Sequence, residues 1–517
     1  MKAFIEKTFI LFAVLILIVT IYFFLLPDSE KNLHIMLTGM NRAKFYPTQA
    51  KFKPYSGKFM GGYAALASAI EDTIKNFNDE QYIFLSLGTE LSGSADAFFT
   101  KGEAVVKILN QLKINAMLLS NIDFSYGWKQ LKNLKEKANF SFIGTNIRNK
   151  ADMSVPEWLS DGIILKTNGR LKIGVLGISP INTPNLTPSE NIEGLTFEKP
   201  TKLLKNKTEY LRKTGADIII LLTQYNRDYL TNEEWADISD SKPDVCIILD
   251  QDLEPPIPFT RDGILVYSIS SYNQTKELDV LDLKFELHPI KITGVSSKRI
   301  PIDLADISPN KEIESSINEA TSEFRALRNT VIGNFDKDYA KCYMEECPIG
   351  NMITDAIKLE TGVQIVLQNS GGIQNSIDSG EFTIGNLYSI LPFSNKIKII
   401  KLKGKDLLEA LNVAASKQRG VLQVSGLNYS FQHNNPSDYT LLSAKLEDNT
   451  PIEPDKEYLT AINNFLYEGG DNFTSFTHGI LISEGRNLRE IVSDYIKSQS
   501  SNGPIKLETY KRIIIEE

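Results

Sequence analysis

Short apolar runs alternate with amphipathic stretches over most of the 517-residue chain, and this alternation restricts the fold more than any other feature. Residues 33–37 and 82–87 are predicted to be strands, and residues 62–77 and 101–112 to be helices. Five more predicted strands continue the pattern at residues 116–120, 142–146, 171–176, 216–222 and 245–249. This order of elements is typical of an α/β domain whose sheet is covered by helices on both faces.

The composition changes after residue 300. Residues 312–327 are charged, with apolar side chains at helical spacing, and are predicted to form a helix that links two domains. A second α/β region follows, with predicted strands at residues 363–367, 397–402 and 459–463 and a helix at residues 404–417. The expected parts are therefore residues 1–31, a first α/β domain at 32–305, a linker at 306–335 and a second domain at 336–517.

The first part contains an uncharged apolar run, residues 8–26, of roughly the length that crosses a bilayer core. Lysines precede the run and acidic residues follow it, which predicts that the body of the chain lies outside the cytoplasm. A cleaved signal peptide is the alternative, but residues 22–27 lack the small residues of a cleavage site. We expect an N-terminal helix that anchors the chain in a membrane, with the body facing the periplasm or the cell exterior.

Charge and cysteine content limit the partners and the crosslinks. The net charge of −8 comes without a basic stripe, so nucleic acid is not expected as a partner. Cys246 lies in an apolar run and is expected to be buried. Cys342 and Cys347 are five positions apart and are compatible either with a disulfide in an exported protein or with two thiols too far apart to bond.

Five short blocks in the second domain carry a resemblance. They are E-C-P-I-G-N at residues 346–351, N-S-G-G-I-Q at 369–374, L-P-F-S-N at 391–395, Q-V-S-G at 423–426 and N-F-L-Y-E-G-G-D at 464–471. In this order they resemble the C-terminal domain of the 5′-nucleotidase family, with its E-S-x-L-G-N, N-G-G-G-I-R, P-F-G-N, Q-V-S-G and N-D-F-x-x-x-G-G-D blocks. The resemblance implies that residues 336–517 form such a domain.

The resemblance also implies a binding site. In the family a nucleotide base stacks between two aromatic rings, and the matching positions here are Phe393 and Phe465. Glycine pairs in the same blocks allow close approach of the backbone and positive φ. The expected ligand-binding residues are Phe393, Phe465, Gly371, Gly372, Asn369, Gln374, Gly469, Gly470 and Asp471.

Two departures weaken the expectation of a phosphate group in that site. The family's arginine in the second block is Gln374 here, and glutamine lacks the charged fork that arginine offers to a phosphate. Residues 336–341 contain lysines where further arginines are expected. The ligand favoured by these changes is neutral and nucleoside-like, or another molecule that carries a ring.

The first domain resembles the family's metallophosphatase domain over residues 33–255, through G-G-Y-A-A-L-A from Gly61, K-G-E-A-V-V from Lys101 and G-A-D-I-I-I-L-L-T from Gly215. Family members hold two metal ions there through Asp, His and Asn. Most of those positions differ here. Met40 and Arg42 replace an Asp and a His, Thr89 replaces an Asp, Ile122 and Gln224 each replace a His, and Asp250 and Asp252 occupy the positions of two further ligands.

The expected consequence is a divergent family member without a metal cofactor. An all-oxygen site for Mg²⁺ or Ca²⁺ is the alternative, with Asn121, Asp123, Asp250, Asp252 and Glu90 as its ligands. The functional prediction is an exported 5′-nucleotidase-like protein that is catalytically degenerate and binds a nucleoside-like ligand or an envelope protein partner. An active nucleotide phosphohydrolase with the oxygen-ligand metal site and a structural envelope component are the two alternatives.

Overall fold

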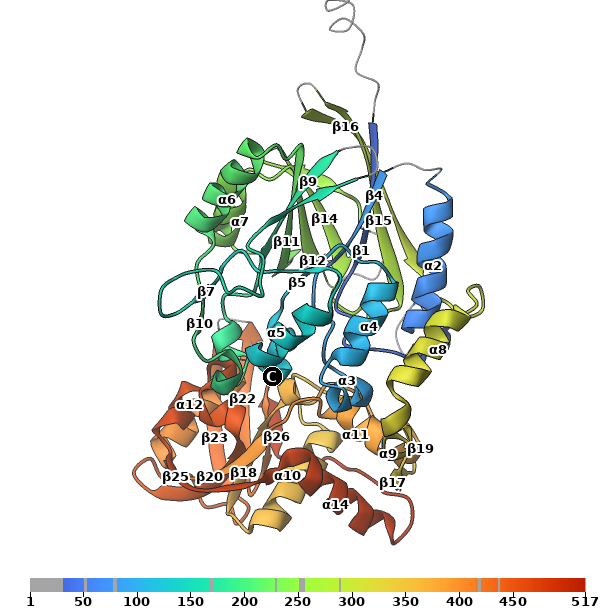
Figure 1. Ribbon diagram of the computed structural model, residues 1–517. Helices are drawn as coiled ribbons and strands as arrows, with labels where there is room; N and C mark the ends of the chain where they lie inside the picture. Colours follow the sequence, from blue (N-terminus) through green and yellow to red (C-terminus); the bar gives the residue numbers. More distant parts are fainter. Residues whose placement is uncertain are drawn as a thin grey trace, which may run out of the picture.

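The computed structural model describes residues 31–50, 54–77, 81–167, 171–227, 230–250, 256–287, 290–416, 420–435 and 438–516. The N-terminal half lies above the C-terminal half in Figure 1, and helix α3 (Ala95–Phe99) meets helices α11 (Ile384–Ile390) and α14 (Leu488–Ser500) where the halves join. The α/β class is confirmed.

The N-terminal half is built on two six-stranded sheets. The first sheet has the order β16 (Ile290–Pro301), β15 (Glu277–Leu287), β1 (Lys31–Thr38), β4 (Gln81–Ser86), β5 (Ala116–Leu118) and β6 (Ser141–Ile143). The second has the order β13 (Phe259–Arg261), β14 (Ile264–Ser270), β12 (Val245–Asp250), β11 (Ile218–Asn226), β9 (Lys172–Ile178) and β8 (Ile163–Lys166).

The two sheets pack face to face, and helices cover their outer faces (Figure 1). Ile218 and Ile220 of β11 point into the core between the sheets, whereas Ile219 points to the outer helices. Every central strand is therefore apolar on both faces. A single sheet between two layers of helices would have the same pattern. The sequence therefore predicted helices on both faces but not a pair of sheets. The covering helices are α2 (Tyr63–Lys75), α4 (Glu103–Gln111), α5 (Trp128–Lys137) and α8 (Lys311–Ala320) on the first sheet, and α6 (Thr201–Lys213) and α7 (Asn232–Ser241) on the second.

The C-terminal half has its own mixed sheet and two cores. Its five strands have the order β21 (Leu422–Ser425), β18 (Ile365–Asn369), β24 (Glu457–Asn463), β20 (Lys396–Lys403) and β25 (Ile480–Asn487). Helices α10 (Pro348–Thr361) and α14 pack on one face, and α12 (Gly404–Ala415) packs on the other. A three-stranded sheet of β23 (Asp438–Leu446), β22 (Leu427–Asn435) and β26 (Ile513–Glu516) adjoins α12.

The helix predicted at residues 312–327 is interrupted. Helix α8 ends at Ala320, and a 3-10 turn at Ser322–Phe324 separates it from α9 (Arg325–Arg328). Ile313 and Ile317 bury α8 in the core of the N-terminal half, beside α2 and α4. The stretch is thus a helix of the N-terminal half followed by a short connection, and the exact domain limits stay a prediction.

The expected partnership with a membrane through an N-terminal helix needs correction. Among the described residues, which begin at Lys31, no helix combines the length and the apolar character needed to span a bilayer. The apolar run on which the expectation depended, residues 8–26, lies outside the described residues.

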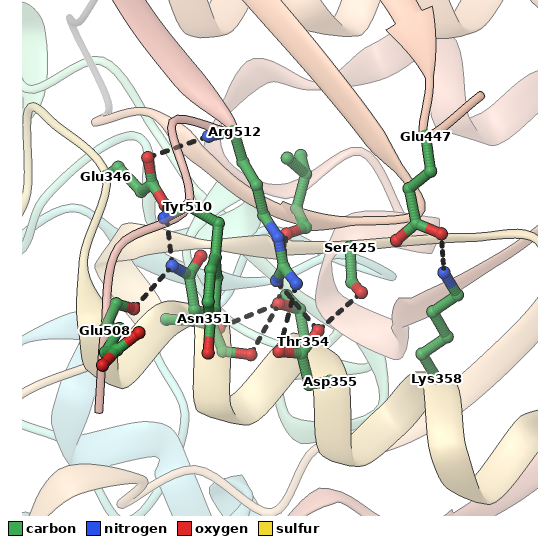
Figure 2. Close-up of polar contacts among 12 residues, drawn as sticks. Glu346, Asn351, Thr354, Asp355, Lys358, Ser425, Glu447, Glu508, Tyr510 and Arg512 are labelled. Atoms are coloured by element: carbon green, nitrogen blue, oxygen red, sulfur yellow. Dashed lines mark hydrogen bonds and ion pairs between the residues drawn. The ribbon is translucent and has the colours of Figure 1, made fainter. Parts of the chain in front are cut away.

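The block at residues 346–351 fixes the C-terminal tail (Figure 2). The Glu346 carboxylate accepts hydrogen bonds from the backbone N–H groups of Tyr510 (2.7 Å) and Arg512 (2.9 Å) and from Asn351 Nδ2 (2.7 Å). Arg512 in turn forms an ion pair with Asp355 of α10 at 2.8 Å. The tail is thereby held where β26 can pair with β22.

Replacing Arg512 by methionine is expected to lower the free energy of unfolding by about 1–3 kcal/mol, because the partly buried Asp355 loses its charged partner. Lys358→Met is the matched control, since Lys358 pairs with the exposed Glu447 and such pairs contribute about 0–1 kcal/mol. Urea unfolding of both variants measures the difference. Equal losses in the two variants would contradict the assigned role of Arg512.

Candidate functional site

A cavity of about 460 Å³ lies between the two halves of the chain. Its lining from the N-terminal half is Arg42, Asn121, Ile122, Leu186, Pro188 and Tyr272. Its lining from the C-terminal half is Lys341, Cys342, Tyr343, Asn369, Gly371, Gly372, Ile373, Gln374, Phe393, Asn395, Phe465 and Asp471. This volume and this mixture of rings and polar groups suit a small organic ligand.

Two half-buried aromatic rings project into the cavity from separate supports. Phe393 lies in the loop between α11 and β20, and Phe465 lies on the short helix α13 (Asn464–Tyr467). A Cβ atom added at Gly470 would come within 2.5–2.6 Å of Phe465 ring atoms, so only glycine lets that ring pack against the backbone. The two rings share a cavity without a ring contact between them among the described residues.

Arg489 of α14 fixes the loop that carries Phe393. Its guanidinium donates to the carbonyl oxygens of Leu391 and Phe393, each at 2.9 Å. The same group lies 4.2 Å from the ring centroids of Phe98 of α3 and Tyr388 of α11. One buried cation therefore supports the Phe393 loop and joins the two halves of the chain.

The polar wall of the cavity is a chain of amide groups that ends in a carboxylate. Asn463 donates to Asn369 Oδ1 at 3.0 Å, and Asn369 Nδ2 donates to Asp471 Oδ2 at 2.8 Å. Asp471 has a φ of +55°, a left-handed conformation that is uncommon outside glycine. Its carboxylate is therefore held in one place, where it can accept hydrogen bonds from a ligand.

Seven of the nine residues expected to bind a ligand line this cavity together, namely Phe393, Phe465, Gly371, Gly372, Asn369, Gln374 and Asp471. Gly470 packs against the Phe465 ring and Gly469 beside Thr474 and Thr477, and of the four glycines only Gly469 has a positive φ, +82°. Gly372 is small for another reason, because a Cβ there would lie 2.4 Å from the Gln368 side chain. Binding by these residues stays a prediction.

Comparison with known proteins adds the family. Residues 327–478 match the family model described as "5'-nucleotidase, C-terminal domain". The whole fold superposes on the crystal structure of a 5′-nucleotidase precursor from Thermus thermophilus with a TM-score of 0.82, at 21% identity, covering 94% of this chain and 99% of that one. Residues 327–478 thus form a 5′-nucleotidase C-terminal domain, and the chain as a whole is similar to 5′-nucleotidases in sequence and fold.

The curated relatives of this chain are distant in sequence. A cell wall protein of Listeria monocytogenes is 24% identical over 88% of the chain, and the match spans 66% of that longer protein. A snake venom 5′-nucleotidase of Crotalus adamanteus is 25% identical over 84% of this chain and 81% of the venom protein.

The positions that the sequence resemblance matches to metal ligands carry other side chains, and the structure shows what these side chains contact. Met40 is packed against the core between the sheets, and Gln224 Nε2 lies 3.8 Å from its sulfur. Gln224 also donates to the Leu87 carbonyl at 2.6 Å. Arg42 donates across the cavity to Gln374 Oε1, so it links the two halves instead of facing a metal.

The acidic residues proposed as oxygen ligands are engaged within the protein. Asp123 accepts from the backbone N–H groups of Thr89 (2.9 Å), Glu90 (2.9 Å), Leu91 (3.0 Å) and Ser120 (2.9 Å). Glu90 accepts from Asn41, Tyr63 and Ser86, and burial raises its pKa to about 7. Asp250 accepts from Ser268 at 2.5 Å, Asn121 lines the cavity, and Asp252 lies outside the described residues.

These donors do not fit two divalent ions. In the described part of the chain, no group of three or more His, Cys, Asp or Glu side chains is arranged to hold a metal. A thioether and a guanidinium occupy two ligand positions, and neither is a ligand that Mg²⁺ or Ca²⁺ prefers.

The structure contains free thiols at the two cysteines that could have closed a loop. The backbone N–H of Cys342 donates to Cys347 Sγ at 3.2 Å, and both residues are free, as is the buried Cys246. Cys342 is also part of the cavity wall.

One buried charged cluster had no signal in the sequence. Arg299 of β16 contacts Asp279 at 3.0 Å and Glu277 at 3.5 Å, both on the paired strand β15, and all three side chains are at most 2% exposed. Burial raises the pKa of Glu277 to about 8, with Arg299 acting in the opposite direction. The alternation of residues 277–301 is compatible with a strand pair but does not show which polar face is covered.

Glu277→Gln is expected to flatten the pH dependence of stability. Between the unfolded pKa, near 4.5, and about 8, folded Glu277 keeps a proton that the unfolded chain has released, so stability declines as the pH rises through this window. Relative to the parent, the variant should gain at least about 1 kcal/mol between pH 5 and pH 8 in urea unfolding. If the free energies of unfolding of the two proteins change with pH in parallel, the raised pKa of Glu277 is contradicted. The control is Glu447→Gln, at an exposed position.

Proposed function

We propose that the chain is an exported member of the 5′-nucleotidase family that binds a nucleoside-like ligand between Phe393 and Phe465 and does not hydrolyse nucleotides by two-metal chemistry. The observation that carries the proposal is the cavity itself, where both rings, Asn369 and Asp471 converge. Export is supported by relatives that are named a cell wall protein and a venom 5′-nucleotidase.

The parts of the cavity suit different parts of such a ligand. Phe393 and Phe465 offer apolar faces on which a planar base can stack, worth roughly 1–3 kcal/mol per ring by analogy with single-stranded nucleic acids. The fixed Asp471 carboxylate can accept hydrogen bonds from hydroxyl groups of an attached sugar. The amide of Gln374 is uncharged, so it offers no charge to the ligand. Its oxygen accepts from Arg42 and its nitrogen donates to the Gly371 carbonyl.

Isothermal titration of the purified full-length chain with adenosine, guanosine and uridine tests the proposal. At least one nucleoside should bind, and Phe393→Ala and Phe465→Ala should each weaken that binding by about 10-fold or more. Phe59→Ala is the matched control, because Phe59 is 57% exposed and lies outside the cavity. The absence of binding by all three nucleosides, or equal binding by all three variants, would refute a base-stacking site.

An active nucleotide phosphohydrolase is the second candidate. It is favoured by relatives named 5′-nucleotidase whose sequences match most of this chain. Phosphate release from AMP, measured with Mg²⁺, Ca²⁺, Mn²⁺ or Zn²⁺ added, is expected to stay at the level without protein. Turnover that disappears in the double variant Asp250→Ala with Asp252→Ala would establish this candidate and an oxygen-ligand metal site.

A further inference from the structure

A second cavity of about 470 Å³ adjoins the first, and Tyr272, Lys341 and Gln374 line both. The contact between Arg42 and Gln374 thus lies beside two cavities rather than one. The walls of the second cavity differ from those of the first, since the only aromatic rings among its described lining residues are Tyr272 and Phe382 and its other walls are mainly polar.

Three lysines from distant parts of the sequence line the second cavity. Lys44 follows β1, Lys276 precedes β15, and Lys341 belongs to the C-terminal half. Lys276 is only 5% exposed, Lys44 is half-buried and Lys341 is exposed. The positive charge therefore extends from the surface into the interior of the junction.

A neutral oxygen accepts a hydrogen bond from each of these three ammonium groups. Lys44 donates to Ser389 Oγ at 3.1 Å, Lys276 to Gln274 Oε1 at 3.1 Å, and Lys341 to the Gln374 carbonyl at 3.3 Å. Among the described residues, neither Lys44 nor Lys341 forms an ion pair with a carboxylate. The lining contains one carboxylate, Asp378, against three lysines.

Such a grouping is costly for the folded protein when no anion is present. Burial, together with the charges of Lys276, Arg42 and Lys341, lowers the pKa of Lys44 to about 7. Burial lowers the pKa of Lys276 to about 8, with Glu277 acting in the opposite direction. The whole chain has a net charge of −8, so this positive junction is a local exception. Groups with perturbed pKa values that converge on a cavity are typical of functional sites, and concave walls concentrate their field on a ligand.

We propose that the cavity lined by Lys44, Lys276 and Lys341 is a binding site for a phosphate-like oxyanion. Its ammonium groups and the amide groups of Gln274 and Asn386 provide donors on several sides, and they need no metal ion. The oxyanion is either free or attached to a ligand whose ring occupies the first cavity, because the two cavities share a wall.

Thermal unfolding of the purified full-length chain tests the site, with inorganic phosphate as probe and sodium chloride keeping the ionic strength constant. Phosphate at about 10 mM should raise Tm by about 2 °C or more. The double variant Lys44→Gln with Lys276→Gln should lose this response, whereas Lys199→Gln, which removes a 74%-exposed lysine, should keep it. No shift in the parent, or the same shift in the double variant, would overturn the proposal.

Two further arms separate this site from the ring site. Phe465→Ala should keep its response to phosphate, so failure of nucleoside binding and failure of oxyanion binding are distinguishable. If AMP stabilises the parent more than adenosine and phosphate added together, one ligand spans both cavities. If it does not, the oxyanion is a separate ligand. In both cases the proposal requires that stabilisation by the oxyanion depends on Lys44 and Lys276.

A measurement on the unchanged protein covers the outcome in which the double variant does not fold. Acetylation of Lys44, quantified by mass spectrometry, reports how accessible its amine is, with the exposed Lys199 as the reference. Phosphate should slow acetylation of Lys44 by about threefold or more and leave that of Lys199 unaffected. Equal rates with and without phosphate would exclude the site.

Discussion

Replacing Arg299 by leucine is expected to lower the free energy of unfolding by about 3–5 kcal/mol at pH 7.5, which is the largest stability effect of any substitution considered. The guanidinium is fully buried, and its removal leaves the ionised Asp279 in the interior without a cation, beside a Glu277 that is mostly protonated at this pH. Tyr267 still donates to Asp279 at 2.8 Å, but a neutral hydroxyl compensates a buried charge only in part.

The pH dependence of this loss separates charge from packing. Burial raises the pKa of Asp279 to about 6 and that of Glu277 to about 8, so at pH 5 both carboxyl groups are largely protonated and the missing cation matters less. The loss measured by urea unfolding should therefore shrink toward pH 5. A loss that is independent of pH would indicate a packing defect, and Lys298→Leu, at the exposed neighbouring position on β16, controls for changes to the strand.

Arg489→Ala is expected to reduce stability and ligand binding together. The substitution removes the charged donor from the Leu391 and Phe393 carbonyls and the cation from between Phe98 and Tyr388, with an expected loss of about 2–4 kcal/mol. Because the loop that carries Phe393 loses its support, affinity for a bound nucleoside should fall by about 10-fold or more. Urea unfolding and calorimetric titration measure the two effects.

Arg486→Ala is the control for Arg489. Arg486 lies three positions earlier, its side chain is 45% exposed, and its partners Glu360 and Asp494 are also exposed, so its loss should change stability by less than about 1 kcal/mol. Arg489→Lys should recover part of the stability, since lysine keeps the charge but not the two-pronged geometry. Normal nucleoside affinity in Arg489→Ala would show that the Phe393 loop does not depend on this residue.

The fold could be predicted because its strands are marked by apolar runs and its C-terminal half by ordered blocks. The ends of β4, β12 and α4 lie within two residues of the predicted ends, and the start of β12 coincides with its prediction. Hydrophobicity does not distinguish one sheet between helices from two sheets packed together, because Ile219 and Ile220 are equally buried on opposite faces. The number of sheets depends on pairing between distant strands, such as β1 with β15, and the sequence pattern contains no register information of that kind.

The sequence likewise predicted some residues of the candidate site and not others. Phe393, Phe465 and Asp471 could be proposed from their blocks because the local sequence around each is distinctive. The engagement of Asp123 and Glu90 in internal hydrogen bonds depends on where N–H and O–H donors lie in three dimensions. The lysine cavity combines positions 44, 276 and 341, and nothing in the sequence relates three isolated lysines that are separated by so many residues.

Strand order also determines when each half of the chain can become complete during synthesis. Strand β1 pairs with β15, so Lys31 can pair with Phe285 only after most of the N-terminal half has been synthesised. In the C-terminal half, β22 pairs with β26, at residues 513–516. The contacts of Glu346 with Tyr510 and Arg512 likewise form only after those residues have been synthesised. Pairings so distant in sequence slow folding, because a long loop must close before the contact forms. The nascent chain therefore carries open strand edges through most of its synthesis, and a stop codon just before β26 would leave the second half without its final strand.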